Sequence, residues 1–592
     1  MSANESAEQV RWDLTDLIDG AGEEGVEALL DTALARAGEF AARYRGALAT
    51  IDGEGLVAAM LALAEIYDLL GRADSYASLD FSTDTTDPAR GALVARVQER
   101  STTLATTLMF FELEWAALSD ERVDQLLGHD GLDFCRHHLR TARRYRPHLL
   151  SEPEELILTE KSLSGAGAWM RLFGELTSAI EVELEATVPL DVALARLVSP
   201  SREVRRESAQ AVTRALEPGL RTRAFVFNTL LVDKATDDRL RHYQHWLAAR
   251  NLANEASDES VAALISAVTG RYELARRWYR LKASLLGLDR LADYDRMAPL
   301  AGDELAVDWP AARELVLDAY ASFSPTLGEL VERFFAEDWI DAPALHGKQG
   351  GAFCAYTVPS VHPYVLLNFT GRRRDVLILA HELGHGVHAA LASQQGIFHQ
   401  ATPLTLAETA SVFGEALTFG RLLEASPTPA ARLALLAEDI EGAIATVFRQ
   451  VTMSIFERLV HTERRERGEL SVERFGELWR QTQEEFLGDS VEITDGYRSW
   501  WSYIPHFINT PGYVYAYAYG QLLALSVYDR YLAEGAGFEP RYLELLGSGG
   551  SRSPEDLGAI VGVDLRDPGF WERGLDLVER RLQEAEEAAR AL

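Results

Sequence analysis

The stretch from Val376 to His388 constrains this chain more than any other. It contains His381, Glu382 and His385 in the pattern H-E-x-x-H. Residues four apart lie on one face of a helix, so the two histidines can offer two imidazole nitrogens to one metal ion. Glu382 is next to the first ligand and can reach a metal-bound water without being aimed at the metal. The pattern therefore predicts Zn²⁺-assisted hydrolysis, with two ligands, one base and a coordination position left for water.

The surroundings of this pattern predict a buried helix. Residues 376–380 and 389–391 are apolar, as is Val387, so the helix is expected to be enclosed nearly all round. A buried polar group without a partner costs about 1–3 kcal/mol, so two buried histidines need partners. A shared metal ion satisfies both. The alternative is a pair of core histidines bonded to neighbouring carbonyl groups.

A third protein ligand is expected on the next helix. The metzincin class would have Gly three residues and His six residues after His385, but those positions hold His388 and Leu391, which excludes it. Glu408 is the predicted third ligand. Glu415, on the same helical face, is a candidate to hold a ligating imidazole by its free N–H, or it is a solvated or capping acid. We interpret His388 as a structural or substrate-side neighbour, not a ligand.

Composition narrows the possible partners and the compartment. The net charge of −33 argues against nucleic acid or an anionic membrane as a partner. No apolar run approaches the roughly 20 residues needed to span a bilayer, and the polar N-terminal residues show no signal peptide. The chain has two cysteines, Cys135 and Cys354, which fits a reducing compartment. We therefore expect a cytoplasmic protein.

Long Ala- and Leu-rich patterns predict a mostly helical chain. Helical periodicity runs from about residue 25 to 118 and again from Ala430 to about Arg467. The length allows two to four ordinary domains or one large helical body. We place the domain boundary near residues 199–201. This gives an N-terminal helical domain of residues 1–200 and a catalytic domain of residues 201–592.

Two strands are predicted just before the metal-binding pattern, over residues 350–358 and 364–369. The first opens with Gly350 and Gly351, which let another backbone approach closely. An extended peptide could pair with this edge through main-chain hydrogen bonds, contacting Gly350, Gly351, Ala352 and Phe353. An ordinary β-hairpin with a flexible entry explains the same residues.

Residues 500–520 form the last informative stretch, which is rich in tyrosine. We expect a Pro-Gly loop that runs into a helix, with Tyr513 and Tyr517 one turn apart. Phenol hydroxyls and the imidazole of His506 are suitable donors for a negatively charged tetrahedral intermediate. The alternative interpretation is an aromatic core stripe.

Together, these segments resemble the thimet-oligopeptidase-like (M3) metallopeptidases, and the oligoendopeptidase F branch most. The resemblance also covers Trp12–Asp16 and residues 168–173. It implies a mostly α, zincin-type fold with a small β-sheet beside the active site. It further implies a deep channel, with the N-terminal domain as one wall, that admits short peptides and excludes folded proteins.

The resemblance also assigns roles to single residues. It implies one Zn²⁺ ion held by His381, His385 and Glu408, with Glu382 as general base. Substrate or transition-state contacts then fall on three residues near the C-terminal end: His506, Tyr513 and Tyr517.

The predicted function is a zinc-dependent metalloendopeptidase that hydrolyses internal bonds of short oligopeptides. One alternative is a carboxypeptidase or dipeptidyl carboxypeptidase on the same scaffold, which would need a cation to hold a C-terminal carboxylate. A second alternative is a non-catalytic, peptide-binding helical protein with structural zinc. Structural zinc normally has four protein ligands, whereas the sequence provides three and a base.

Overall fold

The chain packs as two compact units, each made of three separate segments. The structure is a computed structural model that describes residues 6–18, 22–162, 164–300, 306–426 and 428–592. Unit 1 comprises Met1–Arg146, Glu304–Glu424 and Val527–Asp564, and unit 2 comprises Pro147–Asp303, Ala425–Ser526 and Leu565–Leu592. This division describes packing. The functional division at residue 200 stays a prediction.

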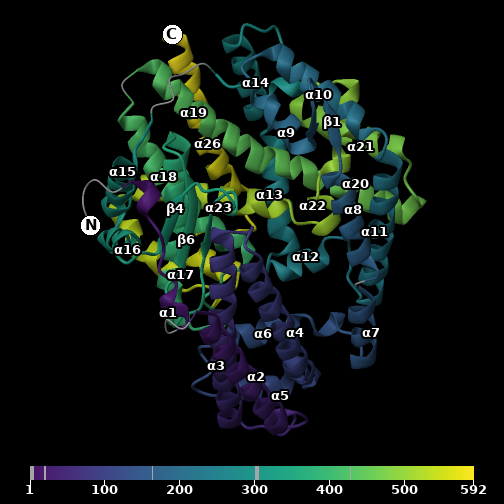
Figure 1. Cartoon of the computed structure of the whole chain (residues 1–592), viewed down its shortest axis with the longest axis vertical. Helices are drawn as coiled ribbons and strands as arrows, with labels where there is room; N and C mark the ends of the chain where they lie inside the picture. The colour runs from purple at the N-terminus through teal and green to yellow at the C-terminus, as the bar shows by residue number, and fades with distance from the viewer. Residues whose placement is uncertain (1–5, 19–21, 163, 301–305, 427) are drawn as a thin grey trace. The chain divides into compact units, whose positions relative to one another are not determined.

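Unit 1 begins with helices and continues into a small sheet flanked by further helices (Figure 1). Its elements are α1 (Thr15–Ile18), α2 (Gly22–Tyr44), α3 (Gly53–Thr83), α4 (Pro88–Ala117), α5 (Asp120–Leu127), α6 (Arg136–Arg144), α15 (Trp309–Phe323), α16 (Pro325–Ala336), β4 (Ile340–Pro343), β5 (Phe353–Ala355), β6 (Tyr364–Phe369), α17 (Arg373–Ala392), α18 (Leu404–Glu424), α24 (Glu539–Gly547) and α25 (Pro554–Ile560). The boundary with unit 2 falls within α23 (Tyr515–Glu534).

The helices α2, α3 and α4 pack together because each has an apolar face. On α3, the buried residues Leu56, Met60 and Leu63 recur every three or four positions, which places them on one side of the helix. The side chain of Asp52 accepts a hydrogen bond from the Gly55 amide and caps the start of α3. The predicted long helical pattern over residues 25–118 is thus confirmed as three helices.

The three-stranded sheet of unit 1 has the strand order β4-β6-β5. β6 is the central strand and almost entirely buried, pairing in parallel with β4 and antiparallel with β5. The antiparallel register aligns Cys354 with Val365. Helix α17 packs against β6 and β5, and Figure 1 shows β4 and β6 beside α17 and α18. The predicted pair of strands is confirmed, and the sheet lies directly beside the helix that carries the H-E-x-x-H pattern.

Unit 2 is also helical, with two small two-stranded sheets, β1-β2 and β3-β7. Its elements are α7 (Glu152–Ser162), α8 (Ala166–Ser178), β1 (Glu181–Glu183), β2 (Thr187–Pro189), α9 (Leu190–Ala195), α10 (Arg202–Leu216), α11 (Leu220–Leu240), α12 (Ala248–Ala253), α13 (Asp258–Gly270), α14 (Tyr272–Leu285), β3 (Leu291–Ala292), α19 (Pro429–Ala443), α20 (Arg449–Arg467), α21 (Val472–Leu487), β7 (Val491–Glu492), α22 (His506–Asn509) and α26 (Pro568–Arg590).

The long helical pattern predicted from Ala430 to Arg467 corresponds to α19 and α20. A π-helical segment over Ile444–Phe448 joins them. Thr428 caps the start of α19 through its side-chain oxygen, with Pro429 in the first turn. Helix α20 continues past the π-helical segment to Arg467, and its buried face carries Glu457 and His461.

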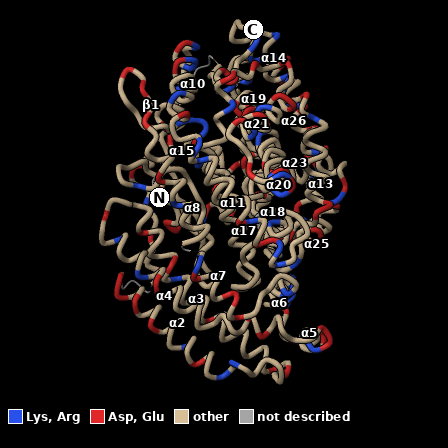
Figure 2. Tube along the Cα trace, turned by 90° about the vertical axis from the view of Figure 1, so that its right-hand side faces the viewer, with Lys and Arg blue, Asp and Glu red and all other residues tan. Residues whose placement is uncertain are grey.

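Acidic residues are spread along the whole described trace, with Lys and Arg residues between them (Figure 2). Many of these charges form ion pairs between residues four apart in the sequence, such as Arg333 with Glu337 and Arg480 with Glu484. Within the described residues, no helix combines the length and the apolar character that a membrane crossing requires.

Candidate metal centre

Helix α17 places His381 and His385 on one side, one turn apart. Its first turn is closed by Asp375, whose carboxylate accepts hydrogen bonds from the backbone amides of Thr370 (2.7 Å) and Arg372 (3.1 Å). The two imidazole rings lie 5.0 Å apart between centroids and are inclined at 80°. They therefore converge on one point instead of stacking.

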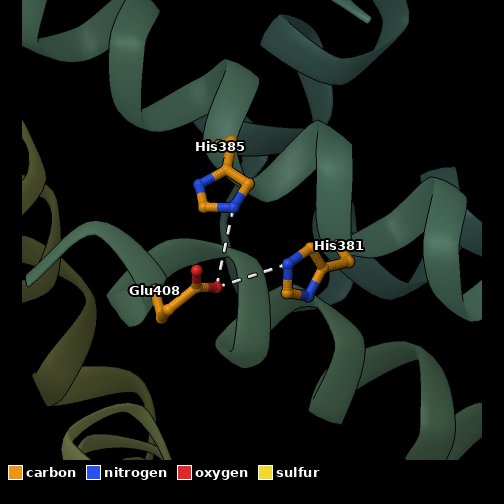
Figure 3. Close-up of side chains that lie close together, drawn as sticks. All are labelled: His381, His385 and Glu408. Carbon is orange, nitrogen blue, oxygen red and sulfur yellow. Dashed lines mark ion pairs between the residues drawn. The ribbon is translucent and has the colours of Figure 1, made fainter. Parts of the chain in front are cut away.

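Helix α18 brings Glu408 to the same point. Its Oε2 atom lies 3.3 Å from Nε2 of His381 and 3.6 Å from Nε2 of His385 (Figure 3). The hydroxyl of Ser411 donates a hydrogen bond of 2.6 Å to the same oxygen. In the described part of the chain, this is the one group of His, Cys, Asp and Glu side chains whose ligand atoms all lie within 4.8 Å of one another.

The donor set fits a zinc ion. Two imidazole nitrogens and one carboxylate oxygen are the ligands of many catalytic zinc sites, which keep a fourth position open. Nδ1 of His381 lies 3.2 Å from Oε2 of Glu415. A proton on Nδ1 that is donated to Glu415 leaves the Nε2 lone pair free for a metal ion. The structure thus places Glu415 where a residue that orients a ligand would be.

The two ligand helices approach each other closely at Gly384. A Cβ atom at this position would lie 2.5 Å from the carbonyl oxygen of Ala410 and 2.5 Å from Cα of Ser411. Backbone atoms cannot move aside cheaply, so only glycine permits this crossing. The third residue after His381 is therefore a packing requirement that brings Glu408 within reach of the histidines.

Electrostatics within the group favour a charged pair in the absence of an ion. Burial alone would lower the pKa of His381, but the carboxylates of Glu408 and Glu415 outweigh it and raise this pKa well above its ordinary value. Burial would raise the pKa of Glu408, yet hydrogen bonding and charge from His381, with His385, lower it to about 2. Glu408 is therefore ionised and ready to bind a cation.

Glu382 is buried beside the ligands. Burial raises its pKa to about 7, the charge of His381 opposes this shift, and Glu408 adds to it. A carboxyl group with a pKa near neutrality can both accept and donate a proton at physiological pH. This is the property that a general base, later acting as a general acid, requires.

His388 is enclosed one turn further along α17. Burial, and then the neighbouring His385, lower its pKa to about 3, so the ring is neutral. Its ring centroid lies 6.4 Å from that of Tyr356, which is the same distance from His385. His388 lies outside the convergent metal-binding group of the described residues.

The predicted peptide-contacting residues lie at the edge strand β5 and the turn before it. Gly350 and Gly351 are exposed, and Gly351 has a φ of +86°. The side-chain amide of Asn368 donates hydrogen bonds to the carbonyl oxygens of Gln349 (2.9 Å) and Gly351 (2.8 Å). Among the described residues β5 pairs with β6 alone, which leaves its outer edge without a strand partner, and Ala352 and Phe353 continue along that edge.

The remaining predicted residues form their own group in unit 2. The Nε2 atom of His506 lies 3.2 Å from the hydroxyl oxygen of Tyr517. The rings of Tyr513 and Tyr517 meet edge to face with centroids 5.1 Å apart, and the ring of His506 lies 6.2 Å from that of Tyr513. All three side chains are partly exposed. Helix α23 begins at Tyr515, so the expected Pro-Gly loop running into a helix is confirmed.

Two further residues support these groups and are not apparent from the sequence. The hydroxyl of Tyr320 on α15 donates a hydrogen bond to the carbonyl oxygen of Ala380, directly before His381. Glu457 on α20 accepts a hydrogen bond from the amide of Gly512, directly before Tyr513. Tyr320 belongs to an apolar helical pattern and Glu457 to a charged one, so neither had a local signal. Only the tertiary contacts identify them.

Comparison with known proteins gives matches along most of the chain. The family model described as Peptidase family M3 matches residues 320–577, and the one described as Oligopeptidase F matches residues 114–181. Oligopeptidase PepF of Bacillus subtilis is 27% identical over 560 residues, which cover 92% of this chain and 82% of that protein.

Solved structures agree on the fold. A crystal structure of a protein from Chlamydophila abortus superposes with a TM-score of 0.86, with 24% identity and 99% of both chains covered. The crystal structure of oligoendopeptidase-F from Enterococcus faecium gives a TM-score of 0.73, with 23% identity, covering 96% of this chain and 99% of that one. At this identity, the likeness confirms the mostly α fold with its small sheets.

Proposed function

The chain belongs to peptidase family M3, and from this we propose that it is a zinc-dependent endopeptidase that hydrolyses internal bonds of short oligopeptides. The observation that carries the proposal is the convergence of His381, His385 and Glu408, with the buried Glu382 next to the first ligand. This combination provides three metal ligands and a base, which is the minimum for metal-assisted hydrolysis.

The three ligands would hold one zinc ion through Nε2 of each histidine and a carboxylate oxygen of Glu408. When bound, zinc supplies Lewis acidity, which polarises the scissile carbonyl and lowers the pKa of water at the site toward about 7. Glu415 keeps the His381 ring in the tautomer whose Nε2 is free, because its Oε2 lies at Nδ1.

Glu382 moves the proton. Its carboxylate accepts a proton from the attacking water as the new C–O bond forms at the scissile carbonyl carbon. The same carboxyl group then donates this proton to the amide nitrogen of the leaving chain as the C–N bond breaks. A pKa of about 7, raised chiefly by burial, suits both transfers, and no covalent bond between enzyme and substrate is needed.

Tyr513, Tyr517 and His506 are proposed to stabilise the negative charge that develops on the carbonyl oxygen. Phenol hydroxyls and an imidazole N–H are strong donors, and preorganised donors of this kind act mainly on the transition state. Their mutual contacts support the proposal, because Nε2 of His506 and the hydroxyl of Tyr517 are 3.2 Å apart and so restrain each other.

The substrate is proposed to bind as an extended strand along β5. Main-chain hydrogen bonds to residues 350–353 would hold a peptide without reading its side chains, which suits an enzyme that cleaves many short peptides. His388, whose ring lies beside that of Tyr356, would limit the space on the substrate side of the metal ligands. One end of the pairing edge is formed by two exposed glycines.

We also propose a cytoplasmic location. The support comes from the two cysteines, Cys135 and Cys354, which are both free thiols. Burial raises the pKa of Cys135 to about 12, so this thiol is unreactive. Free thiols of this kind persist in a reducing compartment.

The test uses the purified full chain and an internally quenched peptide blocked at both ends. An endopeptidase cleaves this peptide at an internal bond, a zinc chelator abolishes the cleavage, and added zinc restores it. Cleavage only after the carboxyl end is unblocked would instead indicate a carboxypeptidase or dipeptidyl carboxypeptidase. Cleavage that survives complete removal of zinc, or zinc binding without any cleavage, would overturn the proposal.

A further inference from the structure

A tight turn in unit 2 precedes the tyrosine helix. The amide of Tyr513 donates a hydrogen bond of 3.1 Å to the carbonyl oxygen of Thr510. Pro511 and Gly512 are the two central residues, and Gly512 has a φ of +75°, which is the pattern of a type II turn. The turn itself leaves the amide of Gly512 unused. A buried amide of this kind needs an acceptor from elsewhere in the fold.

The acceptor is a buried carboxyl group. Oε1 of Glu457 accepts a hydrogen bond of 2.8 Å from the Gly512 amide, and the whole residue is 0% exposed. Burial raises the pKa of Glu457 to about 8, opposed by this hydrogen bond and by the charge of Arg250. No other group of the described residues bonds to its second carboxyl oxygen. Burying a carboxyl group costs free energy unless it is hydrogen-bonded. Among the described residues, the hydrogen bond that offsets this cost comes from the turn.

Helix α12 and the residues before it close the turn from the other side. A Cβ atom at Gly512 would lie 2.6 Å from Cδ1 of Leu247 and 3.4 Å from the ring of Trp246. The ring of Trp246 in turn stacks on His461, one turn after Glu457 on α20, with centroids 4.6 Å apart. The turn is therefore held between α12 and α20, and its glycine is fixed by both conformation and space.

The residues after the turn include the candidate oxyanion donors Tyr513 and Tyr517 and, between them, Tyr515, which anchors the segment to α12. The guanidinium of Arg250 lies 6.0 Å from the ring centroid of Tyr513. Between the two candidate donors, Tyr515 is fully buried, donating a hydrogen bond of 2.8 Å to Asn251 and accepting one of 3.0 Å from Asn254. The direction of Tyr513 and Tyr517 thus depends on the turn that starts the helix and on this anchor.

We propose that Glu457 is a positioning residue: by accepting the Gly512 amide, its buried carboxyl group fixes the turn that aligns Tyr513 and Tyr517. This deepens the proposed function, since it rests on those tyrosines acting on the transition state. Glu457 is fully buried, and the hydrogen bond that it forms among the described residues is to the Gly512 amide. It acts only through the backbone between Thr510 and Tyr513.

The kinetic test compares Glu457→Gln with Glu457→Leu in the zinc-loaded enzyme, using the blocked quenched peptide. Gln keeps an acceptor oxygen for the Gly512 amide, so kcat is expected to stay within about threefold of wild type. Leu keeps the bulk and removes the acceptor, so kcat is expected to fall about 10- to 100-fold with little change in KM. Equal kcat values for the Leu variant and wild type would overturn the proposal.

A double-mutant cycle distinguishes positioning from general damage. In a Tyr513→Phe, Tyr517→Phe background the two hydroxyl groups that the turn aligns are already absent, so adding Glu457→Leu is expected to lower kcat by less than about threefold. A full additional loss in that background would show that Glu457 acts elsewhere and would overturn the proposal. If the wild-type enzyme shows no peptidase activity at all, the proposed function itself fails, and the exchange measurement below still tests the contact.

A readout independent of activity is amide hydrogen exchange of the segment 506–519. Exchange there is expected to rise in Glu457→Leu and stay at the wild-type level in Glu457→Gln. The matched control is Glu441→Leu, which removes hydrogen bonds to Trp278 and Lys282 in the same unit and should leave exchange of 506–519 unchanged. Unaltered exchange in Glu457→Leu, or the same rise in the Glu441 control, would contradict the proposal.

Discussion

The hydroxyl group of Tyr320 donates a hydrogen bond of 2.7 Å to the carbonyl oxygen of Ala380, the residue before His381. Burial, with the charges of Glu415 and Glu382, raises the pKa of Tyr320 far above its ordinary value, so the hydroxyl remains a donor at any physiological pH. This bond joins α15 to α17 at the residue next to the metal ligand His381, so it restrains rotation of α17 about its own axis.

Removing this hydroxyl is expected to loosen the metal site. Tyr320→Phe should weaken zinc affinity about 10-fold, as expected for loss of an outer contact that orients a ligand, and cost about 1 kcal/mol of stability. The measurements are zinc titration against a competing chelator and denaturant unfolding. Tyr364→Phe is the matched control, since its buried hydroxyl donates to the carbonyl oxygen of Asp13 and should affect stability alone. Equal zinc affinities for both variants would contradict the prediction.

The helix crossing at Gly384 leads to a second prediction. Gly384→Ala would place Cβ 2.5 Å from backbone atoms of Ala410 and Ser411, so α18 must move away from α17 and carry Glu408 with it. We expect zinc affinity to fall at least about 10-fold. Gly38→Ala is the control, because nothing lies within 4 Å of that Cβ and alanine is favoured in a helix interior. Wild-type zinc binding in Gly384→Ala would show that the close crossing does not position the ligands.

Glu382→Gln tests the proton-transfer role. The amide has nearly the same size and is not a ligand, so the zinc content should equal that of wild type. The amide cannot accept the proton of the attacking water, so kcat/KM should fall by about 10²- to 10⁴-fold. Metal analysis by atomic spectroscopy and the quenched-peptide assay check the two parts. A variant that binds zinc and cleaves at a near-normal rate would remove Glu382 from the mechanism.

The sequence was sufficient for the residues whose relation is local. His381 and His385 are one helical turn apart, and Glu408 lies on the next helix, so periodicity and motif spacing predict that they converge. The pairing of strands 353–355 and 364–369 could be predicted for the same reason, since the two segments are close in sequence.

Contacts between helices that are distant in the sequence could not be predicted from periodicity or motif spacing. The bond from Tyr320 to Ala380 spans 60 residues and that from Gly512 to Glu457 spans 55. Nothing in a helical pattern tells which turn of one helix meets which turn of another. Gly384 illustrates the same limit. Glycine is required there because a Cβ atom would lie 2.5 Å from the backbone of α18, and the sequence does not show that this backbone is close.

The buried carboxyl of Glu457 predicts a pH-dependent stability. Its pKa of about 8, raised chiefly by burial, exceeds the ordinary value for glutamate, so the folded state binds the proton more tightly than the unfolded state. The resulting stabilisation is complete below the ordinary pKa and is lost as pH rises through about 8. The charge of Arg250 opposes this shift. His461, one turn along α20 from Glu457, is also titratable. Burial, and then Arg465 and Lys234, hold the pKa of His461 well below its ordinary value, so its ring is neutral.

Glu457→Gln removes this titration while keeping an acceptor for the Gly512 amide. Relative to the variant, wild type should lose up to about 1.4 kcal/mol of unfolding free energy for each pH unit between about 5 and 8. Denaturant unfolding of both proteins at about pH 5, 6, 7 and 8 measures the difference and cancels the contribution of every other titrating group. A difference that does not change with pH would mean that Glu457 is ionised in the folded protein throughout. A difference that shifts in favour of wild type with rising pH would mean that folding lowers the pKa of Glu457 instead of raising it.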